Sequence, residues 1–187
     1  ERHWLPLRTD VMDTTTNERL AFIFGRRSIR LYRPGAVDDA MVQTLLEAAM
    51  AAPSAVAKDP WRFIIVRQQA TLARLADALP NGGMLRDAAV GIVVCGDLEA
   101  AHDRQLSYLL QDCSAAIENL LLAAHILGLG ACWLGIHPRE DRIRKVSQML
   151  RLPPSVLPVS AIALGWPGEQ KEPRTRFNPA LVHHETW

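Results

Sequence analysis

The stretch DCSAAIENLLLAAHILGLGACWLGI, residues 112–136, decides the fold more than any other part of the sequence. Apolar residues recur at helical spacing from about residue 103 to residue 129, which predicts one long helix. Its second half is apolar nearly all round, so it must be covered on most sides, either by its own domain or by a second subunit. The glycines of GLGACWLGI, residues 128–136, predict a turn that leads into a short strand.

Helices and strands are predicted on both sides of this stretch, without strict alternation. The segment VDDAMVQTLLEAAMAAP predicts an amphipathic helix that Asp38 caps and Pro53 ends. Three more helices are expected, over residues 17–25, 69–79 and 139–150, and strands over 61–67, 88–97 and 158–168. This mixture favours an α+β fold over a doubly wound sheet.

The length of 187 residues suits one domain, and 49% of the residues are hydrophobic, which is enough for a sizeable core. We expect residues 17–187 to form that domain, with an extended C-terminal tail, and residues 1–16 to be an N-terminal extension. The net charge is +1 without long runs of one sign, which argues against a nucleic acid or a membrane as partner. The most apolar stretch, residues 120–129, is too short to span a bilayer, and no signal segment opens the chain, so we expect a cytoplasmic protein.

Several familiar chemical motifs are missing from the sequence. The three cysteines, Cys95, Cys113 and Cys132, have no CxxC or Cys/His metal spacing and are expected to be buried thiols in a reducing compartment. The adjacent His183 and His184 indicate a solvated tail rather than a metal site. Neither GxGxxG nor GxxxxGK[ST] occurs, so the usual nucleotide-binding loops are absent from the sequence.

Two arginine-bearing segments are candidates for binding a phosphate group. In RRSIR, an extended chain puts Arg26, Ser28 and Arg30 on one face, and guanidinium groups beside a hydroxyl suit a phosphate. In the tail segment KEPRTRF, Arg174 and Arg176 alternate in the same way. Taken alone, each segment is more typical of a solvated basic patch.

Two segments rich in small residues are candidates for contact with a flat ligand. PSAVAKDPW, residues 53–61, links a predicted helix to a predicted strand, and GACWLGI, residues 130–136, lies at the mouth of another strand. Small residues let backbone N–H groups come close to such a ligand. A plain helix-to-strand connection explains the first segment equally well.

The order and spacing of these segments resemble the FMN-dependent nitroreductase family. The resemblance covers about residues 17–178 and is carried by RRSIRLYRPG, LLEAAMAAPSA with PWRFIIV, residues 112–136, and VSAIALGWPGEQKEPRTRF. It implies an α+β sandwich, in which helices flank a central, mostly antiparallel sheet, and an intertwined homodimer with two FMN molecules at its interface. Such a dimer would bury the helix that is apolar nearly all round.

The resemblance also implies roles for individual residues at the FMN phosphate. Arg26 and Ser28 would hold the phosphate, with Arg27 beside them. The tail residues Arg174 and Arg176 would reach the same group. A phosphate of roughly −1.5 to −2 charge is a reasonable target for several guanidinium groups.

Around the flavin ring, the resemblance implies three contacts. Arg30 would lie near the N1/O2 edge, where a cation stabilises the negative charge of a reduced flavin. The loop residues Pro53, Ser54 and Ala55 would pack on the ring from the other subunit. At Leu134 and Gly135, the backbone N–H of a turn would face N5, where hydride arrives and leaves.

The family usually has Asn and Gln where this chain has Ala57 and Asp59. Ala57 cannot replace the hydrogen bond that the asparagine makes to the polar edge of the ring, and a lost contact of this kind costs about 1–3 kcal/mol. An unpaired Asp59 would disfavour a reduced flavin nearby, and Lys58 is the expected neutralising group.

The activity implied is that of an FMN-dependent oxidoreductase, which transfers hydride from NAD(P)H through FMN N5 to a nitroaromatic, quinone or similar acceptor in a ping-pong scheme. The flavin carries the chemistry, so neither a catalytic side chain nor a metal is expected. The alternative, motivated by Ala57 and Asp59, is a flavin-binding protein without general reductase activity, acting as a flavin-consuming enzyme, a store or a sensor.

Overall fold

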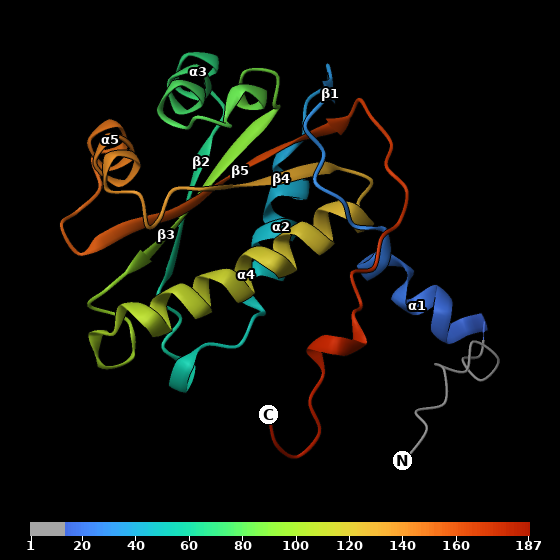
Figure 1. Ribbon diagram of the computed structural model, residues 1–187. Helices are drawn as coiled ribbons and strands as arrows, with labels where there is room; N and C mark the ends of the chain where they lie inside the picture. Colours follow the sequence, from blue (N-terminus) through green and yellow to red (C-terminus); the bar gives the residue numbers. More distant parts are fainter. Residues whose placement is uncertain (1–13) are drawn as a thin grey trace.

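An antiparallel sheet of five strands forms the centre of the computed structural model, which describes residues 14–187 (Figure 1). Strand β5, Val156–Pro167, pairs with three of the other strands. One of its edges carries β3, Val90–Asp97, which in turn pairs with β2, Trp61–Val66. Strand β4, Gly130–Gly135, also pairs with β5, and the short β1, Tyr32–Arg33, pairs with the end of β5 at Trp166 and Pro167. The central antiparallel sheet of the predicted α+β fold is confirmed.

The long helix α4, Leu106–Ile126, covers one face of this sheet together with α2, Asp39–Met50 (Figure 1). It begins later than predicted, because His102–Arg104 form a separate 3-10 turn, η3. Asp103 and Arg104 have φ of 50° and 53°, and these left-handed conformations interrupt a right-handed helix. The buried stripe has the predicted helical spacing: Leu109, Cys113, Ile117, Leu120 and Ala124.

The opposite face of the sheet is covered by α3, Gln69–Ala78, by α5, Glu140–Leu150, and by the 3-10 turn η2, Gly83–Arg86 (Figure 1). Strand β3 lies between the two helical layers and is buried at every position from Val90 to Gly96. Burial on both faces explains why its sequence shows no alternation of polar and apolar residues.

Two predicted helix ends depend on local hydrogen bonds and backbone conformation. Helix α2 is capped as predicted, since the Met41 N–H donates to Asp38 Oδ1 at 2.7 Å. Helix α5 ends at Arg151, which has a left-handed φ of 55°.

The chain enters and leaves the sheet through segments that lie close together. Helix α1, Thr14–Gly25, precedes β1, and the tail after β5 passes the end of α1 before its 3-10 turn η4, Pro179–Leu181 (Figure 1). Most of the predicted N-terminal extension lies outside the described residues, and residues 14–16 already belong to α1. Within residues 14–187, no helix has the length and apolarity needed to cross a membrane.

Strand β4 occupies more of GLGACWLGI than predicted. The turn is confined to residues 127–129, where Gly128 supplies a left-handed φ of 74°. The strand starts at Gly130, where a Cβ would lie 2.7 Å from Ile29 Cγ2, so glycine permits the close approach of the segment after α1. Leu134 and Gly135, predicted in a turn, are the last residues of this strand.

The three cysteines are free and buried, as the sequence predicted. Burial raises the pKa of the Cys95 and Cys113 thiols to about 12. It also raises the pKa of Cys132 above its ordinary value, against the opposing effect of Arg30. These side chains therefore behave as small apolar groups rather than as nucleophiles.

Candidate functional site

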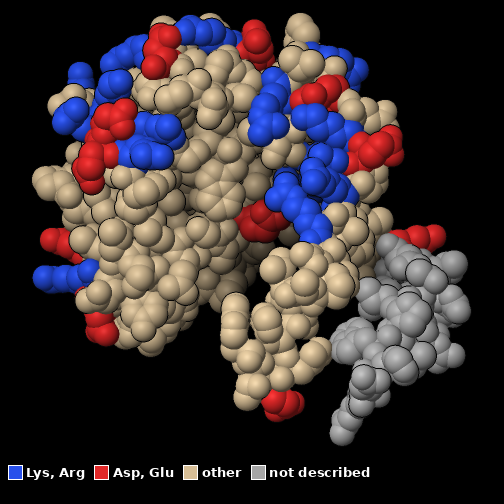
Figure 2. Space-filling model, in the orientation of Figure 1, with Lys and Arg blue, Asp and Glu red and all other residues tan. Residues whose placement is uncertain are grey.

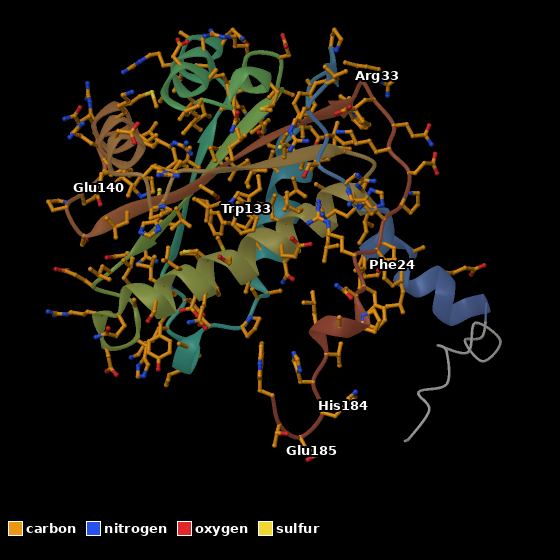
Figure 3. All side chains as sticks on the ribbon, in the orientation of Figure 1. Phe24, Arg33, Trp133, Glu140, His184 and Glu185 are labelled. Carbon is orange, nitrogen blue, oxygen red and sulfur yellow. The ribbon has the colours of Figure 1, made fainter. Side chains whose placement is uncertain are left out.

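The two segments predicted to bind a phosphate lie side by side. The Arg174 N–H donates to the Phe24 carbonyl oxygen at 3.1 Å, at the end of α1 (Figure 3). Lys171 Nζ donates to the Ser28 carbonyl oxygen at 2.7 Å. The tail thus runs along the segment that joins α1 to β1, which is the juxtaposition that the two arginine patterns predicted.

A basic cleft of about 420 Å³ lies between these segments and the C-terminal half of α4. Arg26, Arg27 and Lys171 line it, and Figure 2 shows Lys and Arg side chains gathered over this part of the surface. Arg26 Nε lies 3.4 Å from Glu118 Oε1, but the Glu118 side chain is 49% exposed, so this ion pair is weak. The Arg26 guanidinium can therefore exchange this partner for a phosphate.

The tail arginines lie outside the lining of the cleft in the described chain. The side chains of Arg174 and Arg176 are exposed, although the backbone of Arg174 is anchored on α1. Lys171 is the tail cation that meets Ser28, and the sequence analysis did not single it out. A lysine beside an acidic residue and a proline in a polar tail gives no signal of this role.

Arg26, Ser28 and Arg30 were predicted to share one face of an extended chain, but Arg26 lines the basic cleft together with Ile29, and Ser28 does not line it. Ser28 forms a parallel bridge with Ala131 of β4, and the Ile29 N–H donates to the Ala131 carbonyl oxygen at 3.0 Å. The Ile29 side chain is buried, so the flanking side chains face the other way.

Glu169 fixes the backbone just beyond this bridge. Its Oε1 accepts the Arg30 N–H at 2.6 Å and the Leu31 N–H at 3.3 Å. Lys171 Nζ lies 3.0 Å from the same oxygen. The hydrogen bond from Arg30, supported by Lys171, holds the pKa of the Glu169 carboxyl below its ordinary value of 4.5.

Beyond Ala131, the outer edge of β4 is free of pairing with any other strand of residues 14–187, and this is called its free edge. The Ala131 carbonyl points away from β5, since it accepts the hydrogen bond from Ile29. Backbone groups alternate along a strand, so the N–H groups of Trp133 and Gly135 point to this free edge, whereas the Leu134 N–H points toward β5. Of the two residues predicted to present an N–H to a ligand, the geometry favours Gly135.

A second cleft, of about 690 Å³, runs along this free edge. Arg30 and Gly135 line it together with Trp133, which is 37% exposed and projects from β4 near the middle of the view (Figure 3). The cleft is also lined by three polar residues that the sequence analysis missed: Asn81, Asp87 and Arg142. They come from the turns around η2 and from α5, and no motif links them to β4.

The space beside Gly135 can accommodate a flat ring. A Cβ built on Gly135 would meet nothing closer than the His137 carbonyl oxygen at 4.0 Å, so packing within the described chain does not require glycine. Arg30 lines the same cleft, and the chain from Arg30 back to Arg26 can span at most about 13 Å. The segment therefore joins a cleft suited to a flavin ring with a cleft suited to its phosphate.

The loop PSAVAKDPW lies away from the lining of both clefts. Its 3-10 turn η1, Ala55–Ala57, is held by the buried Asp112 of α4, whose Oδ1 accepts the Ala55 N–H at 2.9 Å. Ser54 Oγ donates to Asp59 Oδ1 at 2.5 Å and accepts the Asp59 N–H at 3.0 Å. Within residues 14–187 no ion pair joins Lys58 to Asp59, and the Ser54 hydroxyl is the hydrogen-bond partner of Asp59.

Three residues of this loop have left-handed backbones. Val56, Ala57 and Asp59 have φ of 52°, 51° and 49°. Asparagine adopts this conformation more readily than alanine or valine, because its short polar side chain can hydrogen-bond locally. The backbone at Ala57 therefore suits the asparagine that the resemblance implies there.

The protein has an antiparallel sheet between two helical layers. One segment joins a basic cleft to a cleft large enough for a flat ring. These features define its class, an α+β protein suited to a phosphorylated ring cofactor. The chain matches the model of the Nitroreductase family over residues 23–82 and 78–166. It is 42% identical over 173 residues to a protein of Archaeoglobus fulgidus assigned as an NADH dehydrogenase/NAD(P)H nitroreductase, covering 91% of this chain and 99% of that one. The chain belongs to the nitroreductase family.

Solved structures agree with this assignment. A protein of Parabacteroides distasonis assigned as an NADH dehydrogenase/NAD(P)H nitroreductase has a TM-score of 0.86 and 39% identity, over 91% of this chain and 99% of its own. A protein of Desulfovibrio desulfuricans assigned as a nitroreductase, solved in complex with FMN, has a TM-score of 0.78 and 35% identity, over 90% of this chain and 96% of its own. The α+β sandwich predicted from the sequence is confirmed.

Proposed function

We propose that this protein is an FMN-dependent oxidoreductase that uses NAD(P)H as reductant. The observation that carries the proposal is the segment from Arg26 to Arg30, which connects the basic cleft to the outer edge of β4. The Archaeoglobus relative and the Desulfovibrio complex support it, because their names refer to an NAD(P)H nitroreductase and to bound FMN.

In this proposal the basic cleft takes the phosphate. Arg26 and Ser28 donate to it, and Arg27, Arg174 and Arg176 add positive charge from both segments. The exposed side chains of the tail arginines are free to turn toward the phosphate because only the backbone of Arg174 is tied to α1. Charge-assisted hydrogen bonds of this kind are about twice as strong as neutral ones.

The second cleft takes the ring. Arg30 places its positive charge at the N1/O2 edge, and the Gly135 N–H on the free edge of β4 faces N5. When bound, FMN supplies the redox chemistry by accepting and donating hydride at N5. The chain orients the ring, stabilises negative charge and excludes water, so the mechanism requires no side-chain acid or base.

A second copy of the chain completes the site in this proposal, with residues 17–187 as the unit that pairs. Pro53, Ser54 and Ala55 then pack on the ring held by the other subunit, which accounts for their distance from the clefts of their own chain. Apolar side chains that one chain leaves exposed support a homodimer: Ile126 at the end of α4 is 63% exposed, and Phe177 and Leu181 in the tail are 58% and 74% exposed.

The acceptor in this proposal is a nitroaromatic, a quinone or a similar compound that binds after the oxidised nicotinamide has left. Ala57 motivates a second candidate function, a flavin-binding protein without general reductase activity, because alanine offers no side-chain hydrogen bond to the ring.

The test begins with the visible spectrum of the purified protein, with the FMN content per chain and the subunit number measured in parallel. It continues with steady-state oxidation of NADH and NADPH, using menadione and a nitroaromatic as acceptors. Turnover with FMN retained supports the reductase, and a yellow protein without turnover supports the second candidate. A colourless monomer that does not bind added FMN refutes both.

A further inference from the structure

We infer that Arg142 forms an oxyanion-binding subsite at the Gly135 end of the second cleft, where a carboxylate or phosphate of a substrate binds. The inference rests on the proposed function, because it places that substrate beside the ring that Gly135 faces. The inference concerns which substrates the cleft prefers, rather than whether the cleft binds a flavin.

The position of Arg142 is fixed by one hydrogen bond. Arg142 lies near the start of α5, and its Nη1 donates to the Gly135 carbonyl oxygen at 2.9 Å. The carbonyl that accepts from Arg142 and the N–H that faces the cleft both belong to Gly135, so the guanidinium lies beside the residue whose N–H faces N5 in the proposed complex. A helix holds the side chain there, which limits its freedom compared with a loop residue.

Most of the binding capacity of Arg142 is unused. A guanidinium has five N–H donors in a planar fork, and the described chain uses Arg142 in one hydrogen bond. None of the ion pairs among residues 14–187 includes Arg142. An arginine that lines a cleft with free donors is suited to two-pronged binding of a carboxylate or a phosphate.

The charges around the cleft also favour an anion. The lining carries two guanidinium groups, Arg30 and Arg142, and one carboxylate, Asp87. Two further carboxylates, Glu140 and Asp141, precede Arg142 on α5, but both are exposed to solvent, where their fields are screened. Arg30 lies at the N1/O2 edge in the proposed complex, which leaves Arg142 as the cation for a ligand beside Gly135.

Trp133 adds an aromatic surface to the same cleft and projects from the same strand as Gly135 (Figure 3). An aromatic acid can therefore combine ring contact with an ion pair to Arg142. A neutral aromatic of the same shape can make only the first of these contacts. The inference thus predicts discrimination between ligands that differ in charge but not in shape.

The first experiment measures equilibrium binding of benzoate and benzamide to the FMN-loaded protein, from the perturbation of the flavin absorbance. We expect benzoate to bind at least tenfold more tightly than benzamide. Equal affinities would overturn the inference, and this result requires no variant.

The second experiment compares three variants. Arg142→Met should reduce the benzoate preference to about twofold or less, and Arg142→Lys should keep part of it because the charge remains. Arg144→Met is the matched control, since Arg144 lies on the same helix, is exposed and does not line the cleft. An equal loss of preference in the Arg144 variant would refute the assignment, because it would reflect the general charge of the helix.

Two kinetic arms then identify the source of the oxyanion. If an acceptor supplies the oxyanion, Arg142→Met raises the Michaelis constant for para-nitrobenzoate. This increase should be at least tenfold larger than the increase for para-nitrobenzamide. If the reductant supplies it, the variant raises the Michaelis constant for NADH more than that for an N-benzyl dihydronicotinamide, which has no phosphates. No selective change in either arm refutes the subsite, whereas loss of FMN from the wild-type protein would refute the proposed function instead.

Discussion

Substitution of Ala57 by asparagine tests the loop and the proposed flavin contact at once. Ala57 is exposed and has a φ of 51°, so the larger side chain meets no packed core. A left-handed conformation costs an ordinary residue roughly 1–2 kcal/mol, and asparagine recovers part of this by local hydrogen bonding. We expect the free energy of unfolding to rise by about 0.5–1 kcal/mol, which corresponds to about 1–4 °C in Tm for a chain of this size.

The second expected effect of Ala57→Asn is on FMN. If the loop packs against the ring bound by the partner subunit, the new amide can hydrogen-bond to the polar edge. A net hydrogen bond contributes about 1 kcal/mol, which corresponds to roughly fivefold tighter binding. The FMN dissociation constant is measured by fluorescence titration. The Tm is measured on flavin-free protein, because bound ligand itself raises it.

Ala57→Gly separates the two effects. Glycine removes the left-handed strain but provides no amide, and the extra freedom of the unfolded chain offsets most of the gain. We therefore expect Ala57→Gly to change neither the Tm nor the FMN affinity appreciably. A lower Tm in Ala57→Asn would refute the loop conformation. A higher Tm with unchanged FMN affinity would refute the ring contact while supporting the loop.

Three further predictions concern the phosphate cleft, the acid stability and a helix end. Arg26→Ala combined with Ser28→Ala should weaken FMN binding by ~100-fold or more, since each charge-assisted hydrogen bond contributes about 1.5–3 kcal/mol. An unchanged FMN dissociation constant in fluorescence titration would contradict the phosphate assignment. Glu169 has a lowered pKa in the folded protein, so the stability that it contributes is complete above its ordinary pKa of 4.5 and is lost as pH falls through the folded pKa. When Tm is measured across that acid range, the Tm of Glu169→Gln should fall less than that of the wild type. Identical slopes of Tm against pH would exclude this role. Asp38→Ala removes the cap of α2 and should cost about 1 kcal/mol, or about 2–4 °C in Tm by calorimetry, and no change would show that the cap does not contribute.

The order of helices and strands could be predicted because each element has its own apolar period. The stripe that includes Leu109, Cys113 and Ile117 gave the long helix, and the unbroken apolar run of β3 indicated a strand buried on both faces. The start of α4 was missed, because the left-handed residues Asp103 and Arg104 are not glycines and carry no sequence signal. The extent of β4 was missed because its pairing with β5 is a long-range contact.

The candidate site divides in the same way. The sequence could single out the segment of Arg26 and Arg30 because its cations are clustered, and these two residues line the basic cleft and the second cleft, whereas Ser28 lines neither. Arg142 and Asn81 could not be predicted, because their place beside Gly135 depends on how α5 and the turns around η2 pack along the edge of β4. Their neighbours in the sequence are those of ordinary surface residues. Contacts set by tertiary packing leave no local pattern.

The free edge of β4 exists because a carboxylate takes over the hydrogen bonds that a strand would make. The Ile29 N–H faces β4, and backbone groups alternate along a strand, so the Leu31 N–H is the next donor that could continue the parallel ladder after the bridge between Ser28 and Ala131. The Leu31 N–H instead donates to Glu169 Oε1 at 3.3 Å, and the segment diverges from β4. The divergence leaves the Gly135 N–H without a strand partner among residues 14–187, at the edge where the second cleft lies. A single acidic residue in the tail therefore determines both where Arg30 is held and whether the strand can present a donor to a ring.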